Sequence, residues 1–132
     1  METGKIAIAR TVGGNASVHI ELVDGTVWLT KHQIADFFEV FTSAVTSNLK
    51  SIFKSRDLKE WEVMKTHRYT DAKGRECQVE FYNLDVLLAL CFRLKGEICN
   101  LFRQWILERI KKPIVASPKT PILIQLRNTM FI

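Results

Sequence analysis

Hydrophobic and polar residues recur with two different periodicities along the first half of the chain. Residues 5–10 and 17–23 alternate with the period of two that is typical of β-strands. Asp24-Gly25 lies between β-branched residues, a dipeptide that favours a tight hairpin turn. The pattern therefore predicts a small antiparallel sheet that ends at Leu29, after which the apolar residues recur at helical spacing.

Two short helices are predicted next, over about 31–38 and 43–53. Thr30 is the expected N-cap of the first helix, and Thr42 or Ser43 that of the second. A small residue, Ala35, precedes a branched apolar residue, Val45, by ten positions. A small residue lets two helices cross closely and a branched one fills the gap, which is the requirement of a helix-turn-helix. The expected buried stripe of the second helix consists of Val45, Leu49, Ile52 and Phe53.

A second hairpin is predicted from two alternating runs, 62–70 and 76–84, joined by a turn over 71–75 that contains glycine and basic residues. A basic hairpin that soon follows a recognition helix is typical of the wing of a winged helix. In that interpretation Lys73 and Arg75 reach the DNA backbone or minor groove, and Arg68 assists along the strand. The alternative is an ordinary exposed hairpin that uses these cations for solubility.

Two packing helices complete the predicted domain. Asn83 caps an almost wholly apolar helix, Lys95-Gly96 interrupts it, and a last helix follows over about 97–111. The apolar stripe expected on that last helix comprises Ile98, Leu101, Phe102, Trp105, Ile106 and Ile110. The predicted fold class is therefore α+β: a single winged helix-turn-helix-like domain over 1–112 with an N-terminal β-hairpin, a β-hairpin wing and two C-terminal packing helices.

The last part of the chain, 113–132, differs in character. Three prolines punctuate its first half, and the segment PILIQLRNTMFI is apolar with one charged residue, Arg127. Three arrangements remain open for this tail: a strand on the edge of its own domain, docking on a second copy in a homodimer, or contact with a protein partner.

Composition narrows the class of protein. A chain of 132 residues with 47% hydrophobic and 25% charged residues suits one globular domain. No apolar run reaches the ~18–20 residues needed to span a bilayer, and the first residues lack the apolar core of a secretory signal. We therefore expect a cytoplasmic protein without a membrane segment. Three cysteines without a CxxC pair, Cys77, Cys91 and Cys99, are interpreted as reduced core thiols.

The net charge of +5 is unevenly distributed. Residues 41–75 carry eight Lys and Arg against four Asp and Glu, whereas residues 1–40 carry three against five. Clustered positive charge is the pattern expected for phosphate contact, although a solvated basic surface gives the same signal. The second helix is expected to enter the major groove of double-stranded DNA. We predict that Thr42, Ser43, Thr46 and Ser47 lie near base edges, and that Lys50, Lys54, Arg68, Lys73 and Arg75 contact phosphates.

Catalytic patterns are missing from the sequence. There is no GxSxG, no Cys/His arrangement and no phosphate-binding GK[ST] loop after Gly13-Gly14. The three histidines share no ligand spacing with the cysteines, and the acids near the second hairpin, Asp71, Glu76 and Glu80, lack the lysine of a nuclease strand. We therefore expect no enzyme activity, no metal and no cofactor.

A family likeness rests on four motifs in order: VWLTKHQIADFF, SNLKSIF, EFYNLDVLLALCFRL and FRQWILERI. Over most of residues 5–112 the chain resembles the N-terminal region of the RhuM-type virulence-protein family, bacterial proteins often linked to mobile elements and regarded as DNA-binding. A looser similarity exists to phage antirepressor amino-terminal domains. The chain departs from the family pattern at Glu39, where glycine is common, and near Ser47, where arginine is common.

The sequence therefore predicts a DNA-binding transcriptional regulator, acting as a homodimer. The resemblance adds an origin associated with mobile elements or virulence. The rival hypothesis is a protein-interaction module that keeps the helix-turn-helix scaffold without binding DNA.

Overall fold

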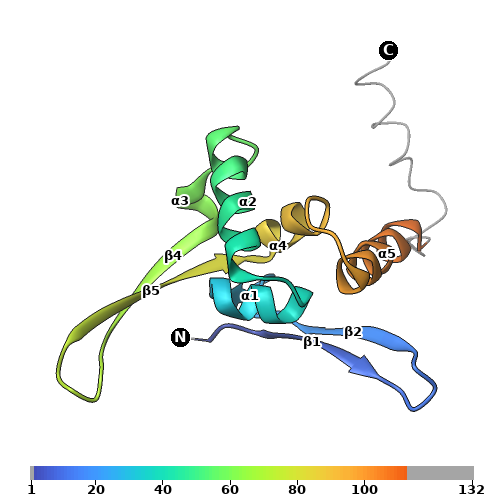
Figure 1. Cartoon of the computed structure of the whole chain (residues 1–132), viewed down its shortest axis with the longest axis horizontal. Coiled ribbons are helices and arrows are strands. Elements are labelled where there is room, and N and C mark those ends of the chain that lie inside the picture. The colour runs from blue at the N-terminus through green and yellow to red at the C-terminus, as the bar shows by residue number, and fades with distance from the viewer. Residues whose placement is uncertain (1, 113–132) are drawn as a thin grey trace.

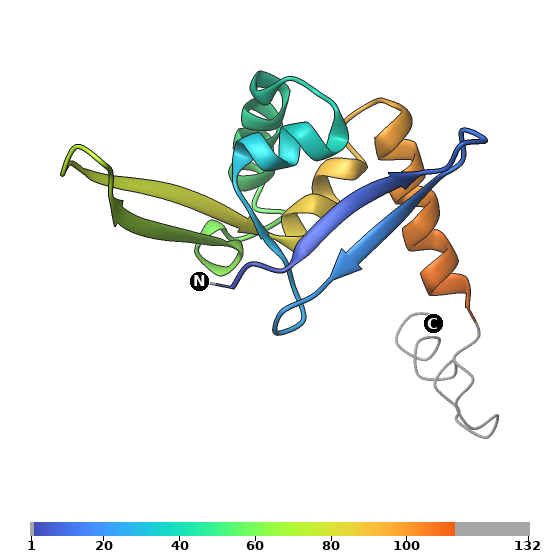
Figure 2. The ribbon, with the colours of Figure 1, turned by 90° about the horizontal axis from the view of Figure 1, so that it is seen from below.

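The structure is a computed structural model that describes residues 2–112, so the predicted tail over 113–132 lies outside the described residues. Two β-hairpins project in different directions from a central group of helices, as Figures 1 and 2 show. The domain is therefore a small mixed α+β domain. In chain order its elements are β1 (Lys5–Arg10), β2 (Ala16–Glu21), β3 (Trp28–Leu29), α1 (Lys31–Phe38), α2 (Thr42–Lys54), α3 (Glu60–Val63), β4 (Met64–Thr70), β5 (Glu76–Asn83), α4 (Leu84–Cys91) and α5 (Glu97–Lys111).

The strands form two sheets instead of the single N-terminal sheet expected up to Leu29. β1 pairs with β2, whereas β3 joins the other sheet in the order β3-β5-β4, antiparallel throughout. The predicted Asp24-Gly25 turn forms, with positive φ at both residues, but it closes only one bridge, Val23 to Thr26. Leu29 then enters the core opposite Tyr82 of β5. Burial of Leu29 thus decides the partner of β3, which local turn chemistry does not specify.

The first helix agrees with its sequence signals. α1 begins after Thr30, whose hydroxyl accepts from the Gln33 amide at 3.2 Å, while the Gln33 side chain accepts from the Thr30 amide at 2.9 Å. This reciprocal capping box satisfies two amides that the first turn of a helix leaves unpaired. At the other end Glu39 adopts the left-handed conformation, with φ 57°.

Replacing the cap should destabilise the domain measurably. We expect Thr30→Ala to lower the free energy of unfolding by about 1 kcal/mol, because the Gln33 amide loses its acceptor. Urea unfolding followed by circular dichroism measures this change. The matched control is Ser43→Ala on the exposed face of α2, for which we expect a change within about 0.5 kcal/mol. Equal effects of the two variants would contradict the capping role of Thr30.

The second helix starts one residue earlier than predicted. Thr42 is its first residue and Phe41 its N-cap, so neither Thr42 nor Ser43 caps the helix, and no side chain bonds to the first amides. The predicted stripe is confirmed, with Val45, Leu49 and Ile52 buried and Phe53 stacked on Tyr82.

Aromatic side chains join α1 to α5 in the core. Phe37 and Phe38 of α1 both meet the ring of Phe102 edge-on, with ring centroids 5.6 and 5.7 Å apart. Trp105 also contacts Phe102, with the two rings stacked. The predicted packing of α1, α2, the sheet and the C-terminal helices into one core is therefore confirmed.

Several expected details of the C-terminal half are wrong. Residues 62 and 63 belong to the helical turn α3 and not to a strand. α4 ends at Cys91, which leaves Phe92 exposed, and Ile110 is 72% exposed because the last turns of α5 extend beyond the β1–β2 hairpin (Figure 2). Helical periodicity identifies an apolar stripe, but the extent of the neighbouring elements decides how much of it is covered.

The cysteines divide into two groups. Cys91 and Cys99 are buried as predicted, and burial raises the pKa of Cys91 to about 12 and that of Cys99 above its ordinary value. Both thiols are therefore held in their protonated, unreactive form. Cys77 contradicts the prediction because it lies half-buried on β5, outside the core.

Candidate nucleic-acid interface

One face of α2 is open to solvent and free of acidic residues. Ser43, Ser47, Lys50 and Lys54 are exposed, and their spacing places them on the side opposite to the buried stripe. Thr42 and Thr46 flank this face and are half-buried. No Asp or Glu occurs between Thr42 and Lys54. The structure thus brings all six predicted residues of α2 onto one continuous surface, which we call the α2 face.

A histidine outside the predicted site residues, His32, lies at the edge of the α2 face. Nδ1 of His32, on α1, is 3.5 Å from Oγ1 of Thr42. His32 precedes Thr42 by ten residues, the same spacing that relates Ala35 to Val45. That spacing, extended to polar residues, is the signal that identifies it. His32 adds an imidazole ring from the first helix to the surface that the second helix presents.

The side chain of Asn48 does not belong to the α2 face. Its side-chain amide donates to the Ala44 carbonyl oxygen at 2.8 Å, one turn earlier in the same helix, and the residue is half-buried. An asparagine that bonds to its own backbone has fewer groups left to bond to a base edge.

Arg93 fixes the C-terminal end of α2. Its guanidinium donates to Oγ of Ser51 at 3.0 Å and to Oδ2 of Asp57 at 2.9 Å, and the latter contact is an ion pair. These partners lie 42 and 36 residues away in the sequence, so no local pattern identifies the contact. Arg93 positions the end of α2 against α4, and it forms an ion pair with Asp57.

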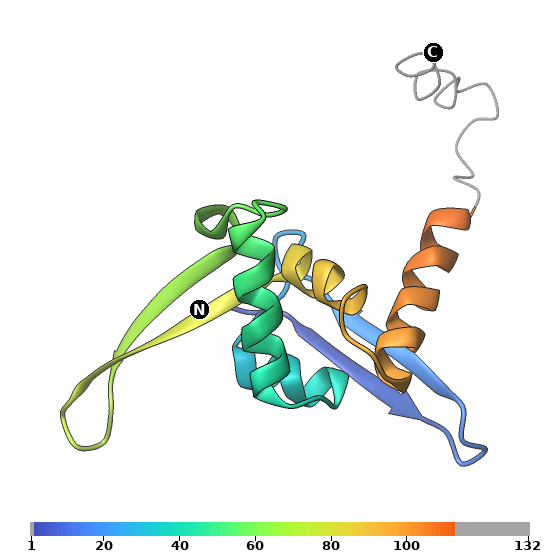
Figure 3. The ribbon, with the colours of Figure 1, turned by 45° about the horizontal axis from the view of Figure 1, so that its top comes forward.

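The β4–β5 hairpin projects to one side of α2, away from the helices (Figures 1 and 3). Register places Arg68 opposite Gln78, on the face that also carries Glu76 and Glu80. The other face carries Lys65, His67 and Tyr69 and no acid. Arg68 is exposed as predicted, but two carboxylates on the same face offset its charge.

The tip of this hairpin is organised by Asp71. One carboxylate oxygen accepts from the amides of Lys73 and Arg75, each at 2.9 Å, and the other accepts from Nε of Arg75 at 3.0 Å. These contacts, foremost the amide of Arg75, lower the pKa of Asp71. Arg75 is therefore engaged within the turn. Lys73 is exposed and pairs with no carboxylate of residues 2–112, which leaves it as the free cation of the tip.

Glu39, the residue that follows α1, is partly neutralised by a cation of the first hairpin. Its carboxylate lies 3.3 Å from Arg10, which also approaches Glu97 of α5 at 3.5 Å. Arg10 stands at the end of β1, so the first hairpin supplies the cation that balances the left-handed turn residue. All three side chains are exposed, and such pairs contribute only about 0–1 kcal/mol each.

Within the described part of the chain, no group of three or more His, Cys, Asp and Glu side chains is arranged to hold a metal ion. None of the helices of residues 2–112 has both the length and the apolarity required to cross a membrane. Comparison with known proteins identified no relative, since no family model, no curated protein and no solved structure matches this chain.

Proposed function

We propose that this domain binds double-stranded DNA as a winged helix-turn-helix, with α2 in the major groove and the β4–β5 hairpin as the wing. The observation that carries the proposal is the α2 face. An exposed helix side built from Ser43, Ser47, Lys50 and Lys54, with no acid in the helix, suits a polyanion surface.

The topology supports the same proposal. β3 precedes the helix pair, β4 and β5 follow it, and the sheet order β3-β5-β4 anchors the hairpin at the base of α2. Phe53 of α2 stacks on Tyr82 of β5, with ring centroids 6.4 Å apart. This contact fixes the position of the helix relative to the hairpin. Two elements that contact one duplex together require such a fixed arrangement.

The side chains of the α2 face divide by chemistry. The hydroxyls of Thr42, Ser43, Thr46 and Ser47 suit base edges and nearby phosphates, because a hydroxyl both donates and accepts. Lys50 and Lys54 suit phosphates. With Lys73 and Arg68 they make about four phosphate contacts, so the logarithm of the binding constant should fall with that of salt concentration with a slope of about −3 to −4. The proposal fails if purified protein shows no salt-dependent binding to mixed genomic fragments.

The wing can be tested separately from the helix. We expect Lys73→Glu to weaken binding to duplex DNA by about 3–10-fold at low salt, because the free cation of the tip is lost and a repelling charge replaces it. Lys5→Glu is the matched control, since Lys5 is exposed on β1 and the change in net charge is the same. Fluorescence anisotropy with a labelled duplex measures both. Equal losses would mean that net charge alone matters and would contradict the wing.

A homodimer that regulates transcription remains part of the proposal, and so does the RhuM-type origin. Sedimentation of the protein with and without bound duplex measures the stoichiometry. Sequencing of genomic fragments selected by the protein identifies the half-site spacing that a dimer imposes.

A specific observation favours the rival function, a protein-interaction module. Phe41, the residue before α2, is 83% exposed, and Phe92 at the end of α4 is 60% exposed. Exposed aromatic residues are common at protein interfaces. The two functions predict opposite results for charge reversal at the wing. Lys73→Glu together with Arg75→Glu should abolish most DNA affinity if the domain binds DNA, and should have little effect if it binds a protein.

A further inference from the structure

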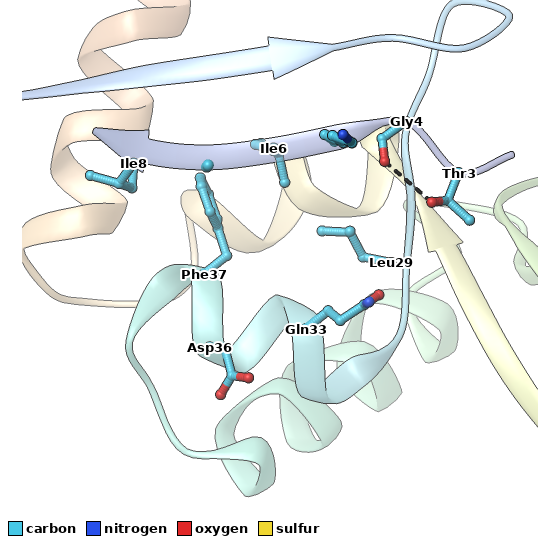
Figure 4. Close-up of a pocket in the computed structure, with 10 residues that line it drawn as sticks. Thr3, Gly4, Ile6, Ile8, Leu29, Gln33, Asp36 and Phe37 are labelled. Carbon is cyan, nitrogen blue, oxygen red and sulfur yellow. Dashed lines mark hydrogen bonds between the residues drawn. The ribbon is translucent and has the colours of Figure 1, made fainter.

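An apolar groove separates the edge of β1 from helix α1. It has a volume of about 530 Å³ and is lined on the β1 side by the consecutive residues Thr3 to Ile8. Leu29, Gln33, Asp36 and Phe37 line the opposite side, as Figure 4 shows. Because successive side chains of a strand point to opposite faces, a lining of consecutive residues means that the backbone edge of β1 borders the groove.

This edge of β1 has unused hydrogen-bonding groups. β1 pairs only with β2 among the strands of residues 2–112, so every second residue of β1 directs its amide and carbonyl toward the groove. Figure 4 shows β1 between β2 and α1, with Ile6, Ile8 and Phe37 directed into the space. An open edge beside apolar side chains has the features of a site for strand addition.

We propose that the C-terminal segment Ile122–Leu126 of the same chain occupies this groove as a third strand beside β1. The sequence of the segment suits the site. Ile122, Ile124 and Leu126 share one side of an extended chain, and the other side carries Leu123 and Gln125. The apolar side would cover Ile6, Ile8 and Phe37. Arg127 follows directly and would form an ion pair with the carboxylate of Asp36 at the rim of the groove.

The length of the connection permits docking within one chain. Nine residues, 113–121, separate Lys112 from Ile122, and an extended chain of that length spans about 30 Å. A domain of about 100 residues has a radius of gyration of about 13 Å. α5 also packs against β2, the neighbour of β1. A connection that spans the site gives an effective concentration of the order of mM, which favours the segment of the same chain over that of another molecule.

Hydrogen exchange in the 132-residue chain tests this proposal. We expect slow exchange at the β1 amides that do not bond to β2. Ile124→Asp should speed exchange at these amides by at least about 10-fold and leave the amides bonded to β2 unchanged. Gln125→Asp is the matched control with the same added charge on the opposite side of the segment, and it should leave exchange within about twofold of the unchanged chain.

Two further measurements make the outcome decisive. A peptide of residues 119–132 added to the Ile124→Asp chain should restore slow exchange along β1. Protection should also be independent of protein concentration. Fast exchange in the unchanged chain, equal effects of Ile124→Asp and Gln125→Asp, or protection that rises with concentration would overturn the proposal, the last because it indicates a second copy. None of these readouts depends on DNA, so the proposed function stands or fails independently.

Discussion

Phe38→Ala should lower the free energy of unfolding by about 3–5 kcal/mol, the largest single effect that we expect in this domain. Phe38 is fully buried, and its ring lies 5.0 Å from that of Phe37 and 5.7 Å from that of Phe102. The substitution removes the buried ring and leaves a cavity where α1 meets α5. Because small domains are stable by only about 5–15 kcal/mol, much of the total would be lost. Urea unfolding monitored by circular dichroism measures the change.

Phe41→Ala is the control for this prediction. It deletes the same side chain three residues later, at a position that is mostly exposed, and we expect a change within about 0.5 kcal/mol. If the two variants are equally stable, the aromatic cluster does not hold α1 and α5 together. If Phe41→Ala is the more damaging, Phe41 has a packing role that its exposure does not indicate.

The combined change Lys50→Glu and Lys54→Glu should reduce affinity for duplex DNA by at least about 100-fold at low salt and lower the salt slope by about 2. Both residues lie on the exposed side of α2, where they would contact phosphates, so their replacement removes two attractions and introduces two repulsions. Anisotropy titrations over a series of salt concentrations measure the affinity and the slope together. Folding is monitored in parallel by circular dichroism, and neither position is buried.

The matched control is the combined change Lys111→Glu and Lys112→Glu. It alters net charge equally, but at the exposed end of α5, which lies far from α2 in Figures 1 and 2. We expect less than about a threefold loss, since charges farther apart than about 10 Å are largely screened at 0.1 M salt. A loss as large as that of the α2 variant would contradict the placement of α2 at the DNA and would indicate binding by diffuse charge. No loss with either variant would favour the protein-interaction module.

The site was only partly predictable from the sequence. The α2 face follows from helical periodicity, since the residues between the apolar positions must point outward. The ion pair between Asp71 and Arg75 is also local, since the two residues lie four positions apart in one turn. By contrast, Arg93 reaches Ser51 and Asp57 across the fold. A contact of that kind depends on how α4 packs on α2, which no local pattern encodes.

By itself the sequence determined those structural features that depend only on residues close together along the chain. These are the capping box at Thr30, the turn at Asp24-Gly25, the buried side of α2 and the existence of the β4–β5 hairpin. Capping, turn type and periodicity involve residues within about one helical turn or one hairpin of each other, so their energies are readable locally.

Tertiary structure alone decided which strand β3 joins, which cations stay free and where apolar surface is left uncovered. β3 joins β5 because Leu29 is buried opposite Tyr82, whereas the preceding turn would serve a β2–β3 hairpin equally well. The open edge of β1 and the groove beside α1 arise in the same way. The physical reason is that burial and ion pairing depend on distances between segments far apart in sequence, and packing sets those distances.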